Sequence, residues 1–272
     1  MDSYSSLAAV ERTLQVIEIL IGKVDGVSVT EIVNESGLSK SMVSRILTTL
    51  KGTGYVEQDA RTRFYKLSLG YISTVYRHIN ALEIEDIFYP LLERLAERTG
   101  ELIQLTLVKE DGIYFVAKVE GSNPLKIATM LGRKAPLHAT AAGKIWLASL
   151  SDEEVMNVIW RTGLKAFTEK TITTPNALLE EIAKIRQKGY SIANEEINED
   201  IIAIAVPIYD HRMRSKVIAS IVVAAPKFKM NSARIEELFE ICKEETASFD
   251  SSPLASFGLG YQSQRLITSL NK

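Results

Sequence analysis

The chain has 272 residues, of which 46% are hydrophobic and 24% are charged, with a formal net charge of −2 and a pI near 6.0. These values are ordinary for a globular protein and exclude a broadly basic coat for nucleic acid. No apolar run reaches the roughly 18–20 residues of a membrane span, and the N-terminus lacks a secretory signal pattern. Because Cys242 is the single cysteine, no intrachain disulfide can form, and we expect a cytoplasmic protein without membrane contact.

A first helix is predicted over residues 7–21, where apolar residues recur at helical spacing. We expect this apolar face to pack against the two helices that follow. Its members are Leu7, Val10, Leu14, Ile17 and Leu20 or Ile21.

Residues 28–51 show the pattern of a helix-turn-helix. Ser28 with Glu31 three residues later forms a capping-box pattern that begins a short helix, and Gly37 ends it. Ser39 is the expected N-cap of a second helix with one apolar face. The other face is cationic and hydroxylated, as in a recognition helix that enters a major groove. The residues expected to face DNA are Ser39, Lys40, Ser41, Ser44, Arg45 and Thr48.

Two short strands are predicted next, Tyr55-Val56 and residues 64–67, joined by a polar turn that contains Arg61 and Arg63. A hairpin directly after a recognition helix is a wing, and arginines at its tip can reach phosphates or a minor groove. Between residues 36 and 66, six Lys or Arg stand against two acids, which places positive charge where DNA would lie. The alternative is a generic three-helix domain with a hairpin, which gives the same apolar periodicity.

The rest of the chain predicts a mixed α+β domain with a mostly antiparallel sheet, because its strands are joined as hairpins. A helix over residues 69–82 links this domain to the first and packs either on a partner subunit or on its own domain. Further helices are predicted over 84–98, 140–150, from Ser151, 177–188 and 232–249. Strands are predicted over 102–108, 113–119, 125–131, 201–209 and 217–225.

Residues typical of enzymes are present but are not arranged for chemistry. Cys242 lies in a helix pattern as a small buried hydrophobe, and Gly143-Lys144 lacks the glycine-rich lead-in of a phosphate loop. Glu195-Glu196 is more typical of a solvated edge or a hydrogen-bonded turn than of acid–base catalysis. The histidines have no metal-ligand spacing: His78, His138 and His211. We therefore predict no catalytic residue, no metal and no cofactor.

Residues 136–144 are the best candidate for a ligand loop. They lead into a helix, and the first amide groups of a helix are unpaired and attract an anion. The alternative is an ordinary helix start.

Several segments resemble a known family. GLSKSMVSRILTTL (residues 37–50), followed by GYV, is similar to the DNA-binding domain of the IclR family of transcriptional regulators. LGRKAPLHATAAGK (residues 131–144), GYSIANEE (residues 189–196) and IAVPI (residues 204–208) resemble that family's effector domain. The resemblance covers roughly residues 6–250 in the family's order.

The resemblance implies a domain plan and partners. The expected domains are a winged helix-turn-helix over 1–68, a linker helix over 69–83, a GAF-like effector-binding domain over 84–250 and a C-terminal tail over 251–272. The expected partners are a double-stranded DNA operator, a small-molecule effector, often a carboxylic acid or an aromatic, and further copies of the chain in a homodimer or homotetramer. The rival hypothesis is a small-molecule-converting enzyme with an accessory winged-helix module.

The resemblance also implies where an effector would bind. Backbone amides at Ala141, Ala142 and Gly143 would form one side of the pocket. The facing positions are Ala193, Ala203, Val222 and Ala224, where a carboxylate-binding relative would show Asp, Cys or Ser. Because these side chains donate no hydrogen bond, we expect an effector larger and more apolar than a small keto acid, with any carboxylate at the turn. A further departure is Asp200, where the family usually has Gly.

Overall fold

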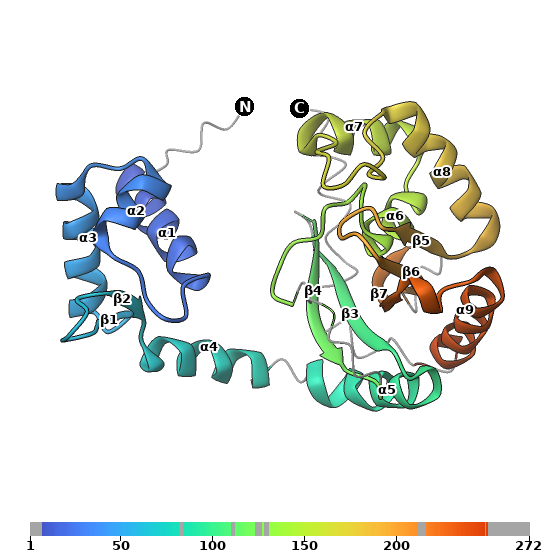
Figure 1. Ribbon diagram of the computed structural model, residues 1–272, viewed down its shortest axis with the longest axis horizontal. Helices are drawn as coiled ribbons and strands as arrows, with labels where there is room; N and C mark the ends of the chain where they lie inside the picture. The colour runs from blue at the N-terminus through green and yellow to red at the C-terminus, as the bar shows by residue number, and fades with distance from the viewer. Residues whose placement is uncertain are drawn as a thin grey trace. The chain divides into compact units, whose positions relative to one another are not determined.

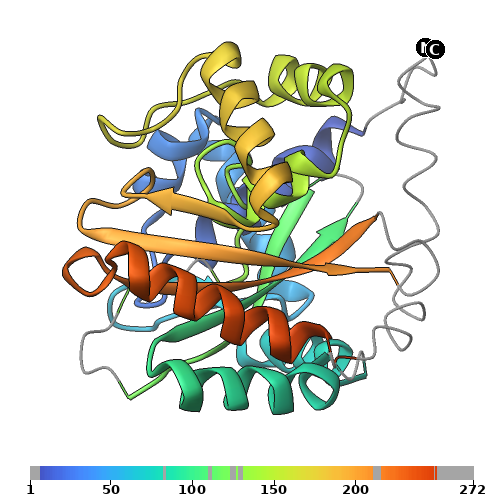
Figure 2. The ribbon, with the colours of Figure 1, turned by 90° about the vertical axis from the view of Figure 1, so that its right-hand side faces the viewer.

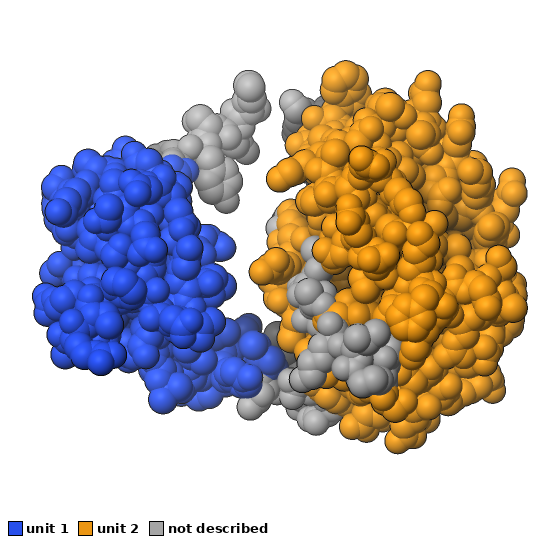
Figure 3. All heavy atoms as spheres, viewed as in Figure 1, with its two compact units in different colours: residues 1–83 blue, residues 84–272 orange. Residues whose placement is uncertain are grey.

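The structure is a computed structural model in which the chain forms two compact units, residues 1–83 and residues 84–272 (Figure 3). The strand predicted over 125–131 lies almost wholly outside the described residues, as do His211 and the tail over 251–272. None of the described helices is both long enough and apolar enough to cross a membrane. The described residues are 7–81, 84–109, 112–122, 127, 131–210, 216–247 and 249.

The first unit is a winged helix-turn-helix, as predicted (Figure 1). Ser28 and Glu31 form the capping box, Gly37 ends the helix with φ 69°, and the Ser39 side chain caps the next helix. These predictions are confirmed. They could be made from the sequence because each depends on residues within four positions of one another. The elements in order are α1 (Ala8–Ile21), α2 (Val29–Ser36), α3 (Lys40–Gly52), β1 (Val56–Gln58), β2 (Tyr65–Leu67) and α4 (Leu69–Ala81).

The prediction for the first helix is only partly confirmed, because Ile17 and Leu20 pack in the core but most of the predicted stripe does not. Val16 and Leu20 are the α1 residues buried in the core of the unit, beside residues of α2 and α3 such as Ile32 and Leu47. The residues that were expected in this core but lie exposed are the N-cap Leu7 and, within α1, Val10, Leu14 and Ile21. The helix carries two apolar stripes, and spacing alone does not say which one meets the core.

The wing is a short antiparallel hairpin in which Val56 pairs with Leu67 and Gln58 with Tyr65. Tyr65 also pairs with Val27 in an isolated bridge, and the Val27 amide donates to the Tyr65 carbonyl oxygen at 2.9 Å. The hairpin is therefore attached to the segment before α2 as well as to the end of α3.

The second unit is an α+β domain built on a five-stranded antiparallel sheet, which confirms the predicted class. The strand order is β4-β3-β7-β6-β5. β5 was not predicted, because four residues are too few for alternation to be recognised. The elements are α5 (Ile84–Thr99), β3 (Leu102–Lys109), β4 (Gly112–Val119), α6 (Ala141–Ala148), α7 (Asp152–Thr162), α8 (Pro175–Lys188), β5 (Ser191–Asn194), β6 (Ile201–Tyr209), β7 (Val217–Pro226), the 3-10 turn η1 (Lys227–Lys229) and α9 (Ser232–Ala247).

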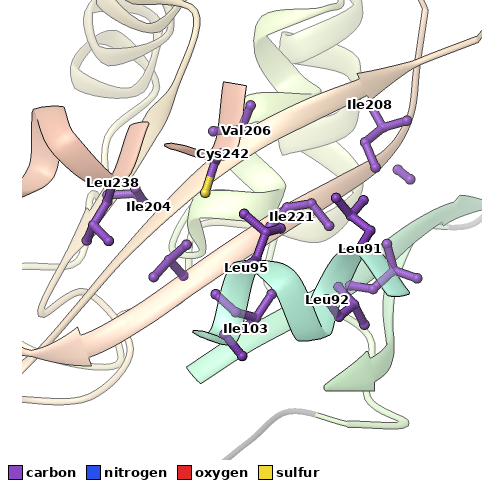
Figure 4. Close-up of a cluster of buried hydrophobic side chains, with 14 of the residues drawn as sticks. Leu91, Leu92, Leu95, Ile103, Ile204, Val206, Ile208, Ile221, Leu238 and Cys242 are labelled. Atoms are coloured by element: carbon purple, nitrogen blue, oxygen red, sulfur yellow. The ribbon is translucent and has the colours of Figure 1, made fainter. Parts of the chain in front are cut away.

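Helices cover both faces of this sheet (Figure 2). Alternate residues of β6, such as Ile204 and Val206, point to the face covered by α5 and α9, where Leu95 and Cys242 complete a core (Figure 4). Ala205 of the same strand belongs to the second core, beneath α6, α7 and α8. The two-residue period of the strands thus divides the apolar residues between two cores.

The start of α6 is held close against the segment before it. Thr140 is the N-cap, and its hydroxyl accepts from the Gly143 amide at 3.0 Å. A Cβ at Gly143 would lie 2.2 Å from the carbonyl oxygen of Leu137, so only glycine allows this approach. Ser191 of β5 donates to the Ala141 carbonyl oxygen at 2.6 Å. These contacts fix the N-terminal end of α6 over the sheet.

Candidate functional site

The N-cap and outer face of α3 present all six residues predicted for the recognition helix. The opposite face is buried through Val43, Leu47 and Leu50, so the orientation of the helix is set by the core. The exposed residues are Ser39, Lys40, Ser41, Ser44, Arg45 and Thr48. Two of their hydroxyls already serve the helix, since Ser39 caps the Met42 amide at 3.4 Å and Thr48 donates to the Ser44 carbonyl oxygen at 2.8 Å.

The wing is shaped by Asp59, whose carboxylate accepts from the amides of Arg61 at 3.0 Å and Thr62 at 2.6 Å. Hydrogen bonds from Thr62 lower the pKa of Asp59, because they favour the charged carboxylate. Arg63 adopts φ 63°, a left-handed conformation in which non-glycine residues are uncommon. An arginine is therefore held at the turn despite its backbone cost.

The cations of this unit fall into two groups. Lys66 pairs with Glu57 at 3.2 Å, and Lys23 pairs with Glu35 at 2.7 Å. Within the part of the chain that the structure describes, no carboxylate forms an ion pair with the predicted DNA-facing cations: Lys40, Arg45, Arg61 and Arg63. These four cations lie on the outer face of α3 and on the wing, where they are available to phosphates.

Ser68 joins the wing to α4. Its hydroxyl donates to the Gly54 carbonyl oxygen, and its amide donates to the Tyr55 carbonyl oxygen at 2.9 Å. The Tyr71 ring of α4 packs on the Tyr55 ring, with centroids 4.7 Å apart. The start of α4 is thus fixed to the turn that ends α3. The apolar side chains of α4 beyond Tyr71 are exposed, so they do not pack on their own domain, which was one of the two alternatives.

The second unit contains an open cavity between the sheet and the start of α6, with an empty volume of about 520 Å³ including its mouth. Six of the seven predicted effector residues line it: Ala141, Ala142, Ala193, Ala203, Val222 and Ala224. Strand register brings Ala193, Ala203 and Ala224 together, because Ala203 pairs with both of the others, and Val222 lies two residues before Ala224 on the same face of β7. Gly143 is not among the lining residues, and its amide already donates to Thr140.

Polar residues that the sequence analysis did not select also line the cavity: Gln104, Thr140, Glu196 and Asn198. Gln104 lies beside Val222 in the sheet register and is 6% exposed. The available signal was its place inside the strand LIQLTLV, where apolar residues occupy both faces and a polar residue is unusual.

A buried ion pair lies behind this cavity. The Nζ of Lys144 is 2.5 Å from Oε1 of Glu196 and 3.7 Å from Oε1 of Glu181, and the Lys144 side chain is 1% exposed. Burial raises the pKa of Glu196, and the Lys144 charge opposes that shift. Oε2 of Glu196 and Oε1 of Gln104 are buried without a hydrogen-bond partner.

The turn at Glu195 and Glu196 is not a solvated edge, because both residues are only 6% exposed. The hydrogen-bonded-turn alternative is the correct one. Hydrogen bonds from Lys170 and Lys227 lower the pKa of Glu195 to about 2. Asp200, which closes the turn, adopts φ 61°, a conformation that suits the glycine usual at this position in the resembling family.

The residues considered for enzyme chemistry have structural roles. Cys242 is fully buried, and this burial raises the pKa of its thiol to about 12, so it is a poor nucleophile. His138 lies with Nε2 2.9 Å from the Lys165 carbonyl oxygen. Among the described residues, no group of three or more His, Cys, Asp or Glu could hold a metal ion.

Comparison with known proteins identifies both units. The model of the IclR helix-turn-helix domain matches residues 9–60, and the model of the bacterial transcriptional regulator IclR C-terminal domain matches residues 76–250. The chain is 32% identical to the HTH-type transcriptional regulator KdgR of Escherichia coli over 236 residues, which is 87% of this chain and 88% of the relative. It is 27% identical to the transcriptional repressor IclR of Escherichia coli over 244 residues, 88% of each. The crystal structure of Thermotoga maritima IclR, 28% identical, superposes with a TM-score of 0.68 over 93% of this chain and 98% of that one.

Proposed function

This chain belongs to the IclR family of transcriptional regulators, and we propose that α3 and the wing bind its operator while the alanine-lined cavity binds its controlling effector. The family consists of DNA-binding regulators with a C-terminal effector domain, so the rival hypothesis of an enzyme is wrong. Because its operator is DNA, we infer that the protein acts in the cytoplasm.

The observation that supports the DNA interface is the group of exposed cations without an ion pair on α3 and the wing. Arg45 lies at the exposed centre of α3, while Arg61 and Arg63 lie on the wing, and no carboxylate among the described residues neutralises them. A helix in the major groove reads bases, and a wing contacts the backbone. Selection of bound sequences from random duplex DNA by the full chain should yield a specific operator. Recovery of unrelated sequences only would contradict the proposal.

The observation that supports the effector site is the row of small apolar residues facing the first amides of α6. Ala141 and Ala142 are the first two residues of α6, and their amides have no acceptor among the described residues. Small residues leave space, so the cavity suits a molecule larger than a keto acid of two or three carbons, such as an aromatic acid or a lactone.

Val222→Asp tests this site, because Val222 is 3% exposed and lines the cavity. The new carboxylate would meet an apolar ligand without a partner, so effector binding should be lost while operator binding by the separate first unit remains. Val222→Thr keeps the side-chain shape and serves as the control. Calorimetry that shows tight pyruvate or glyoxylate binding, undisturbed by Val222→Asp, would rule the proposed site chemistry out.

We propose a homodimer, or a homotetramer made of two dimers. The first unit exposes apolar stripes on α1, through Val10 and Leu14, and on α4, through Ile72, Val75 and Tyr76. A symmetric dimer would cover such stripes and would place two recognition helices on an inverted repeat. Sedimentation of the full chain should give a dimer or larger, and Leu14→Glu should shift it toward the monomer. A wild-type monomer at micromolar concentration that still binds its operator would contradict this.

A further inference from the structure

Two residues that line the cavity, Glu196 and Gln104, each have a buried side-chain oxygen without a hydrogen-bond partner, Oε2 of Glu196 and Oε1 of Gln104. Each belongs to a residue that is 6% exposed. A buried polar atom without a partner is costly and therefore uncommon in a folded protein. Both atoms belong to residues that line the same cavity, so a ligand bound there could satisfy both.

The type of group that fits is set by Glu196. A carboxylate oxygen accepts hydrogen bonds and cannot donate them while it is ionised, whereas the Gln104 amide can be turned to present either an oxygen or an amino group. The other Glu196 oxygen is already occupied by Lys144 at 2.5 Å and by the Asn194 amide at 3.3 Å. The free oxygen therefore requires a donor.

The charges around Glu196 also favour a hydrogen-bond donor over an anion. Lys144 supplies one positive charge, and the two carboxylates near it belong to Glu196 and Glu181. A second anion placed against Glu196 would be repelled in a site of low polarity, where charge interactions are weakly screened. A neutral hydroxyl or an amino group would be attracted.

We infer that the effector of this protein carries a hydroxyl or amino group that donates to Glu196 and contacts Gln104, and that a carboxylate is not accepted at this end of the cavity. This inference rests on the proposed function, in which the cavity is the effector site. An apolar body would lie over Ala203 and Ala224, and an acceptor group, if present, would face the amides of Ala141 and Ala142. The effector thus has an apolar body with a hydroxyl or amino group at the Glu196 end, and any carboxylate that it carries lies at the Ala141 end.

The test uses matched probes on three scaffolds, phenyl, naphthyl and cyclohexyl. Each scaffold carries one substituent: a hydroxymethyl group (the alcohol), the methyl ether of that alcohol, or a carboxylate. Binding to the full chain is measured by calorimetry and by the shift in melting temperature. On the scaffold that fits the cavity, the alcohol should bind about tenfold tighter than its ether, since a hydrogen bond to a charged acceptor is lost. The alcohol and the ether decide the test, because the carboxylate probe can instead place its charge at the amides of Ala141 and Ala142.

Two variants separate ligand recognition from folding. Gln104→Leu removes an unpartnered buried amide, so the unliganded protein should melt at a higher temperature while the preference for alcohol over ether falls. Glu196→Gln removes the negative charge and adds a donor, so the carboxylate probe should gain affinity relative to the alcohol. A structural role alone would not change the ranking of probes.

Ethers that bind the wild-type chain as tightly as their alcohols would overturn the inference, as would the failure of every alcohol to bind. An unchanged ranking of probes in Gln104→Leu would overturn it too. Operator binding is measured in the same samples. An alcohol that binds with the expected preference but leaves operator binding unchanged would contradict the proposed function and leave the inferred chemistry of the cavity intact.

Discussion

The two units differ in where they place their charged side chains and in whether these are paired. The first unit exposes the cations that we propose bind DNA and leaves Arg45, Arg61 and Arg63 without an acidic partner among the described residues. The second unit buries Lys144 to 1% exposure and pairs it with Glu196, a cavity-lining residue that has one buried oxygen without a hydrogen-bond partner. An exposed charge remains available to a polyanion, whereas a buried pair fixes the geometry of a small site.

This difference explains how each unit tolerates change. An exposed cation costs little to remove, because water replaces its contacts, so its loss appears in binding and not in folding. Removal of one member of a buried pair leaves the other charge without compensation, so the loss appears first in stability. Mutations of charged residues should therefore weaken DNA binding in the first unit and weaken stability in the second.

Lys144→Ala should have the largest effect. It leaves Glu196 buried without its principal cation, so the second unit should lose about 3–5 kcal/mol of stability. Urea unfolding followed by tryptophan fluorescence measures this unit alone, since both tryptophans, Trp146 and Trp160, belong to it. Lys243→Ala removes an exposed lysine at 3.3 Å from Glu240 and is the control, with an expected loss of less than about 1 kcal/mol. Equal losses would break the comparison.

Arg45→Ala should weaken specific operator binding by about 1–3 kcal/mol and relax the preference at one base position, if Arg45 contacts a base edge. Arg61→Ala and Arg63→Ala should weaken binding to all sequences and flatten its salt dependence, because phosphate contacts release counterions. Lys66→Ala is the control, since Lys66 is already paired with Glu57. A salt titration in which Arg45→Ala and the wing variants behave alike would show that these roles are wrongly assigned.

Gly143→Ala should destabilise the second unit by about 1–3 kcal/mol, because the new methyl group would overlap the Leu137 carbonyl group and force the start of α6 away. Gly189→Ala is the control. Gly189 has φ 79° with open space around its Cα, so alanine there costs only the backbone strain, about 1 kcal/mol. If both variants unfold at the same urea concentration, close packing at Gly143 is not what fixes the start of α6.

Acid should weaken the second unit through Glu195. Its pKa falls from 4.5 to about 2 in the folded state, so its contribution is complete above pH 4.5 and is lost as the pH falls toward 2. Glu196 has a raised pKa in the folded state, so its contribution to stability increases, rather than decreases, as the pH falls. Glu195→Gln should flatten the fall in stability between pH 4.5 and 2, while the exposed Glu93→Gln should not. An unchanged acid limb in Glu195→Gln would count against the lysine contacts to Glu195.

Arg63→Gly should have the smallest effect on folding and the opposite sign. Glycine accepts φ 63° without strain, so the first unit should gain about 0.5–1 kcal/mol, measured by thermal unfolding. Operator binding should weaken, because a phosphate contact is lost. Asp200→Gly relieves a similar conformation, φ 61°, in the second unit and should leave operator binding unchanged. Weaker folding in Arg63→Gly would mean that the arginine side chain stabilises the wing.

The sequence by itself determined the parts of the fold that depend on near neighbours. Ser28 with Glu31 and Ser151 with Glu154 form capping boxes, and each uses groups three residues apart. The recognition helix could likewise be oriented from sequence, because its apolar and polar residues separate onto two faces. The turn before α6 could also be located from the sequence, because the family resemblance there rests on a run of adjacent residues, 131–144.

Only the tertiary structure decided what distant residues do together. Lys144 and Glu196 are 52 positions apart, and Gln104 meets Val222 only because β3 and β7 pair. The face that α1 buries was also undecided, since both of its apolar stripes satisfy helical spacing and the choice depends on where α2 and α3 lie. Periodicity records which residues share a face, but contact across a fold depends on strand register and chain reversal, which no local pattern contains.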